Sequence, residues 1–192
     1  MLSWEEIARK VESESGGHET IVRVEGTSVS ESGGAGLAKK AILILLGNDP
    51  VIHAVDSYVA RDLGSELARS VLRLLRPTVA MDRCYQIYKS SNDLWTRRWA
   101  AELLGGLATS HAVDRMKELL IDKDEHIQLV AASAVTSMIL DEFVTEDEAL
   151  DLVETLEKHP HKLVKQRAVE SRKYFNEVFN DEYEDDDEDD LE

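Results

Sequence analysis

The chain has 192 residues, of which 43% are hydrophobic, and this is enough to build the core of one domain. Its 39 acidic and 22 basic side chains give a formal net charge of −17, which makes nucleic acid a poor partner because a polyanion is bound through Lys and Arg. Neither a basic leader nor a run of about 18 apolar residues is present, so we expect a soluble cytoplasmic protein without a membrane partner.

The first predicted element is a helix that begins at Trp4. Ser3 and Glu6 have the spacing of a capping box, and Leu2 with Ile7 has that of a hydrophobic staple. The apolar side chains of this helix recur at the helical period and lie on one face: Trp4, Ile7, Ala8 and Val11.

The sequence SESGG occurs twice, at 13–17 and 30–34, and predicts two flexible connectors. Between them, residues 18–30 contain β-branched side chains that favour extended backbone, followed by a Glu-Gly pair that favours a turn. A small hairpin and a mobile loop are both open for this segment, because two isolated strands are only marginally stable. Residues 1–36 are therefore predicted to be an N-terminal helix with Gly/Ser-rich connectors.

From Leu37 onward the apolar periodicity is helical. We predict helices over 37–46, 50–63, 65–75, 78–90, 94–108, 111–121, 125–140, 145–158 and 161–179. Three prolines fall at helix starts, where a missing N–H has no cost: Pro50, Pro77 and Pro160. Thr145 with Glu148 has the spacing of a capping box, and the connectors are so short that consecutive helices must pack as antiparallel neighbours. Residues 37–179 are thus predicted to be one all-α domain, with a disordered tail at 180–192.

One motif repeats along these helices. DLWTRRWAAELLG, at 93–105, resembles the second-helix signature of HEAT-like repeats, in which an Asp precedes a Val-Arg pair, Ala-Ala and Leu-Gly. Weaker copies occur at 48–64, 124–135 and 159–169. In this signature the Asp caps the helix, the Ala pair lets helices approach closely and the Gly ends the helix. The resemblance implies an α-solenoid of antiparallel helix pairs over 37–179, and an irregular helical bundle is the alternative.

No set of catalytic, cofactor-binding or metal-binding residues stands out. The six histidines form no HExxH motif, and the single cysteine, Cys84, lies in an apolar periodic stretch that predicts a buried thiol. His159 and His161 stand in basic surroundings that would repel a cation, so we expect a solvated helix cap there. The glycines at 33–36 lack the following Lys-Ser/Thr of a phosphate-binding loop. We therefore expect a non-enzymatic protein without a cofactor.

Trp95 and Trp99 are four residues apart, share one helix face and have Arg98 beside them. Aromatic residues and arginines of this kind anchor many protein interfaces. Because tryptophan is mostly buried, however, packing between neighbouring repeats is the favoured interpretation of the pair.

Opposite charges meet at the C-terminus. Residues 181–192, DEYEDDDEDDLE, contain ten carboxylates, including Asp185, Asp186 and Asp187, and without them the chain has a net charge of only −7. Six basic side chains lie just before this tail: Lys158, Lys162, Lys165, Arg167, Arg172 and Lys173. Either the tail rests transiently on this basic cluster and shields it, or the cluster balances a helix C-terminus and the tail only aids solubility.

The resemblance to HEAT-like proteins implies a scaffold, adaptor or regulator, because stacked helix pairs present a long surface to other macromolecules. The favoured function is a non-catalytic protein-binding module that recognises a basic protein partner, with a bacterial immunity protein against a cationic toxin as one form. A maturation factor resembling HEAT-like bilin lyase subunits is the second candidate, and a general assembly factor that holds basic clients is the third. A resemblance to HEAT-like DNA glycosylases is disfavoured by the negative charge.

Overall fold

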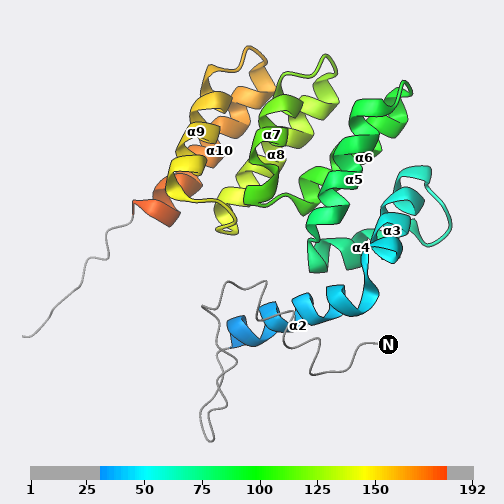
Figure 1. Cartoon of the computed structure of the whole chain (residues 1–192). Coiled ribbons are helices and arrows are strands. Elements are labelled where there is room, and N and C mark those ends of the chain that lie inside the picture. Colours follow the sequence, from blue (N-terminus) through cyan, green and yellow to red (C-terminus); the bar gives the residue numbers. More distant parts are fainter. Residues whose placement is uncertain (1–30, 181–192) are drawn as a thin grey trace, which may run out of the picture. The chain divides into compact units, whose positions relative to one another are not determined.

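A computed structural model of the chain describes residues 31–180 (Figure 1). Within that range the regular elements are all helical, which confirms the all-α prediction. The helix predicted at Trp4, the hairpin or loop at 18–30 and the acidic tail at 181–192 lie outside the described residues. The helices are α2 (Glu31–Leu46), α3 (Asn48–Ala60), α4 (Ser65–Leu75), α5 (Thr78–Ser90), α6 (Leu94–Leu107), α7 (Val113–Leu120), α8 (Glu125–Leu140), α9 (Glu146–Lys158) and α10 (Lys162–Phe179), with a short 3-10 helix, η1 (Ser110–Ala112), before α7.

The predicted helices from residue 37 onward are all found, with differences at some ends. α2 begins at Glu31, so the connector predicted over 30–34 is wrong from that residue on. Glycine lowers helix stability by about 1 kcal/mol relative to alanine. The apolar residues at 41–46 favour burial of the later part of α2, and the helix extends back across the glycines.

α3 ends at Ala60, three residues earlier than predicted. Arg61 adopts a left-handed conformation with φ 60°, and its backbone N–H bonds to the carbonyls of the preceding turn, which closes the helix without a glycine. Leu63 consequently lies in the connector and is fully exposed, although its place in the repeat motif predicted a helical residue.

The structure divides into two compact units between Gln86 and Ile87, within α5. In unit 1, α3 packs against α4 and contacts α2. Its core includes Val55 and Tyr58 from α3 and Leu72 from α4, and all three are buried. The Arg83 Nε of α5 donates to Asp56 Oδ1 of α3 at 2.7 Å, which joins two helices of this unit.

Unit 2 is a stack of antiparallel helix pairs in two layers, and it confirms the predicted α-solenoid (Figure 1). One layer contains α6, α8 and α10, with α8 in contact with both neighbours, and the other contains α7 beside α9. The apolar faces of these helices are fully buried between the layers: Leu103, Leu104, Leu107, Met116, Leu119, Leu120, Ile127, Met138, Ile139, Leu152, Val153 and Leu156.

Side-chain caps start three of these helices as the sequence predicts. Asp93 accepts from the Thr96 amide at 2.7 Å, and Asp124 accepts from the Ile127 amide at 3.2 Å. Thr145 and Glu148 form the predicted capping box at the start of α9. Each cap satisfies backbone donors that have no partner inside the helix, which fixes where the helix begins.

Gly105 corrects the role given to glycine in the repeat motif. It lies inside α6, which continues to Leu107, so it does not end the helix. A Cβ atom at this position would come within 3.2 Å of the Ala134 Cβ and of the Val130 Cγ1 on α8. The glycine therefore permits close approach of two helices in the same layer.

Candidate protein-binding surface

A buried polar network holds the helix pairs of unit 2 in register. Asp122, in the connector before α8, accepts from Tyr88 Oη of α5 at 2.6 Å and from the Arg97 guanidinium of α6. Its second oxygen accepts from the Asp124 amide at 2.8 Å. Burial, with the neighbouring Asp122 carboxylate, raises the pKa of Tyr88 well above its usual range, so the phenol stays a hydrogen-bond donor.

Arg98 and Asp124 form a second link between α6 and α8. The guanidinium donates to both carboxylate oxygens, at 3.0 and 2.7 Å, and these bonds hold the pKa of Asp124 below its usual range. Trp95 stacks on Arg98, with 5.1 Å from the guanidinium carbon to the ring centroid. Trp95 is nevertheless 61% exposed and Trp99 is half-buried, so burial of the pair between repeats is wrong for Trp95. The Trp95 ring packs instead on the surface ion pair of Arg98 and Asp124.

His159 and His161 connect α10 to the preceding helix pair. His159 is buried, with Nε2 2.8 Å from the Leu120 carbonyl oxygen, while its Nδ1 accepts from the His161 amide at 3.1 Å. A neutral imidazole protonated at Nε2 satisfies both bonds. The predicted solvated cap is therefore wrong for His159, because a backbone carbonyl of the neighbouring repeat takes the place of water.

The layer of α6, α8 and α10 carries two shallow grooves that meet on α8. The first, between α6 and α8, has a volume of 310 Å³. The second, between α8 and α10, has a volume of 420 Å³. Leu129 and Ser133 line both grooves, so they form one surface. Its lining combines apolar and small side chains with polar and charged groups: Glu102, His126, Arg167 and Glu170.

An acidic surface lies beyond one end of the first groove. Ser137, which lines that groove, is one turn before Asp141, the residue at the C-terminal end of α8. Four exposed carboxylates follow around the connection from α8 to α9, and we call them the acidic turn: Asp141, Glu142, Glu146 and Asp147. Two partly exposed apolar side chains, Leu140 and Leu150, stand beside them. A surface that combines carboxylates with apolar groups is suited to bind a basic protein segment, which supplies both opposite charge and apolar contact.

Other carboxylates between residues 141 and 157 form hydrogen bonds or ion pairs within the fold. Glu148 belongs to the capping box, and Asp151 pairs with Lys117. Glu154 pairs with Lys158 at 2.7 Å. Within residues 31–180, Glu142, Glu146 and Asp147 of the acidic turn are exposed and form none of these ion pairs.

The basic cluster predicted at 158–173 is brought together on α9 and α10, but four of its six members are ion-paired. Lys158 pairs with Glu154, Arg167 with Glu170, Arg172 with Glu157 and Lys173 with Glu177. The bidentate bonds from Arg172 hold the pKa of Glu157 below its usual range. Lys162 and Lys165 are exposed. Asp185, Asp186 and Asp187 of the tail lie outside the described residues.

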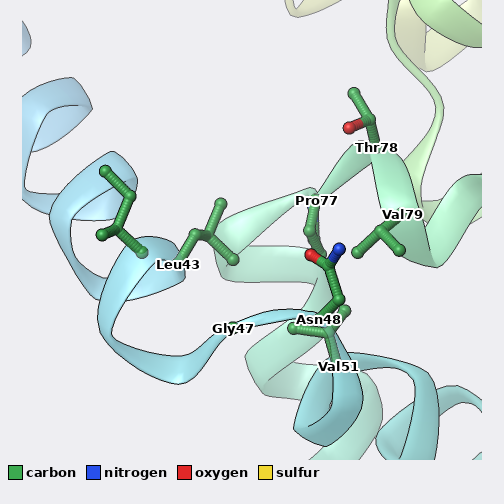
Figure 2. Close-up of a pocket in the computed structure, with 8 residues that line it drawn as sticks. Leu43, Gly47, Asn48, Val51, Pro77, Thr78 and Val79 are labelled. Atoms are coloured by element: carbon green, nitrogen blue, oxygen red, sulfur yellow. The ribbon is translucent and has the colours of Figure 1, made fainter. Parts of the chain in front are cut away.

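Unit 1 has a cavity of its own, of 370 Å³ (Figure 2). Leu43 of α2, Val51 of α3 and Val79 of α5 supply apolar walls, and Asn48 and Thr78 add polar groups. None of these side chains is titratable, so the cavity provides no group for acid–base chemistry.

Residues 81–173 match the sequence profile of HEAT repeats. This range covers α6 to α9 completely, with α5 from Met81 and α10 as far as Lys173. Residues 81–173 therefore form a HEAT-like repeat region. HEAT repeats generally mediate interactions between proteins and are typically non-catalytic, which is consistent with a scaffold or adaptor. No curated protein and no solved structure matches the chain.

Neither a metal-binding cluster nor a membrane-spanning helix is found within residues 31–180. Nowhere in this range do three or more His, Cys, Asp or Glu side chains gather closely enough to hold a metal ion. None of the helices described there has both the length and the apolar character needed to cross a membrane. Cys84 is buried as predicted.

The acidic turn was not among the residues selected from the sequence, although a signal for it exists. Residues 141–157 contain eight carboxylates and no basic side chain. The carboxylates of residues 181–192 are denser, so they give a stronger signal than this shorter run inside the HEAT-like region.

Proposed function

We propose that this protein is a non-catalytic scaffold or adaptor that binds a basic protein partner through the acidic turn and the adjoining α6–α8 groove. The observation that carries the proposal is the position of the acidic turn. Its carboxylates are exposed and adjoin apolar side chains, whereas most of the basic cluster on α9 and α10 is neutralised by ion pairs. A basic partner gains attraction from the first surface and meets little repulsion from the second.

Inhibition of a cationic toxin, as by an immunity protein, is the finer form of this proposal. Charge complementarity accelerates association, which is useful when a toxin must be captured before it acts. In this proposal the ten carboxylates of residues 181–192 add further negative charge. A toxin gene directly beside the gene for this chain would support this form, and its absence would favour a general adaptor.

The test neutralises the acidic turn without changing its shape. The variant Glu142→Gln/Glu146→Gln/Asp147→Asn replaces three exposed carboxylates by amides of nearly the same size. A pull-down with the full chain, followed by mass spectrometry, should capture predominantly basic proteins. The triple variant should reduce the capture several-fold, and raising the salt concentration should have the same effect because it screens exposed charges.

A matched control removes the same charge elsewhere. Asp49→Asn/Asp62→Asn/Asp114→Asn neutralises three exposed carboxylates outside the acidic turn. This variant should capture as much as the wild type. Equal losses in both triple variants would mean that only net charge matters, and a captured set without basic proteins would contradict the proposal.

A further inference from the structure

α4 exposes an apolar stripe that no other described helix of unit 1 covers. Leu67, Val71 and Leu74 recur at spacings of four and three residues, so they lie on one face, and they are 70%, 41% and 62% exposed. The opposite edge of the same apolar arc, at Leu72 and Leu75, is buried. An amphipathic helix normally buries its whole apolar arc, so this stripe indicates a missing partner.

We propose that residues 2–11 of the same chain form the amphipathic helix predicted from the sequence and pack their apolar face on this α4 stripe. The segment has strong start signals, a capping box and a hydrophobic staple. A helix of this length is only marginally stable alone in water, so its apolar face, which includes Trp4, Ile7 and Val11, needs a surface to pack on. The stripe on α4 has the matching helical spacing and similar length.

The connection is long enough. Residues 13–30 provide 18 residues between the predicted helix and α2, which span about 60 Å when fully extended. α2 has 16 residues and is therefore about 24 Å long. The segment can accordingly double back along unit 1, and its tether keeps its local concentration high.

A second copy of the chain is a less suitable occupant. α4 has 11 residues and is about 16 Å long. One face of such a helix is smaller than the roughly 1,000 Å² that a stable interface between separate molecules buries. A tethered segment forms the contact without the entropy loss of bringing two molecules together.

Hydrogen exchange of the full chain tests this packing. Amides of residues 4–11 should exchange at least about tenfold more slowly than in a synthetic peptide of residues 1–12. Leu67→Glu/Leu74→Glu should return them close to the peptide rate, and both residues are exposed, so unit 1 should still fold. Val169→Glu, at a 72% exposed position of α10, is the matched control and should leave the protection unchanged.

The reciprocal variant Trp4→Ser/Ile7→Ser lies outside the described helices and should speed exchange in α4. Peptide-like exchange of residues 4–11 in the wild type would overturn the proposal, as would protection that survives Leu67→Glu/Leu74→Glu or α4 exchange that is unchanged in the reciprocal variant. Protection that disappears on dilution would show that the segment docks on a second copy, and this would overturn the intramolecular contact.

Discussion

Unit 1 and unit 2 are built from similar helices but differ in how much of the apolar surface of these helices is buried. In unit 2 the helices bury most of their apolar side chains, although Ile121 and Val169 are exposed, and side chains from one helix pair bond to the next, as Arg98 does to Asp124. In unit 1 several leucines remain exposed, and Arg83 with Asp56 supplies an ion pair between α5 and α3. The difference shows that the repeat motif specifies the contacts between neighbouring pairs as well as the helices. In unit 1, where the motif is degenerate, helices form but part of their apolar surface is not covered by another described helix of that unit.

The largest expected effect comes from removing the same atoms in each unit. Leu104→Ala deletes a fully buried side chain in α6 and should cost about 2–5 kcal/mol of unfolding free energy. Leu63→Ala deletes a fully exposed side chain in the connector between α3 and α4 and should cost less than about 1 kcal/mol. Denaturant unfolding measures both variants, and equal costs would remove the distinction between the units.

The next effect concerns the polar network of unit 2. Asp122→Ala leaves Tyr88 Oη and the Arg97 guanidinium without their shared acceptor in a partly buried site, and it should cost about 3 kcal/mol. Thermal unfolding measures this loss. Lys123→Ala, at the exposed neighbouring position, should change stability by less than about 0.5 kcal/mol. A loss for Asp122→Ala as small as that of the control would show that the network does not hold the repeats together.

A smaller effect is expected in acid. Because Arg98 lowers the pKa of Asp124 in the folded state, this carboxylate adds stability above its unfolded pKa of about 4, and the contribution is lost as the pH falls through the folded pKa. Arg98→Met removes the cause. The variant should therefore lose less stability than the wild type between pH 7 and pH 3 in denaturant unfolding. The same acid-induced loss in both proteins would assign the pH dependence to other carboxylates.

The smallest effect is predicted for the tail. Deletion of residues 181–192 should change the stability of α10 by less than about 1 kcal/mol at low salt, because four members of the basic cluster are ion-paired within the fold. Hydrogen exchange of α10 measures the change. A large increase in α10 exchange would instead support a tail that shields Lys162 and Lys165.

Local patterns in the sequence were sufficient for most helices. Asp93, Asp124 and Thr145 act on backbone amides three residues away, so their caps depend only on neighbouring residues. The buried face of α9 follows from periodicity alone. The end of α3 did not follow, because its Arg61 takes a left-handed conformation that the sequence favours only weakly.

Features of the surface depend on contacts between distant residues and were harder to predict. His159 is buried because the Leu120 carbonyl, 39 residues earlier, reaches its ring. Trp95 lies at the surface, where it stacks on Arg98, and Arg98 is bonded to Asp124 at the N-cap of α8. Glu142, Glu146 and Asp147 are distinguished from the rest of their run only once the ion pairs of Asp151 and Glu154 are known.

The most direct test of the proposed binding surface is hydrogen exchange of the full chain, alone and bound to the basic partner captured by it. The account predicts slower exchange on binding at residues 137–151, where the groove end and the acidic turn meet. Protection confined to α4 or α10, with 137–151 unchanged, would contradict it.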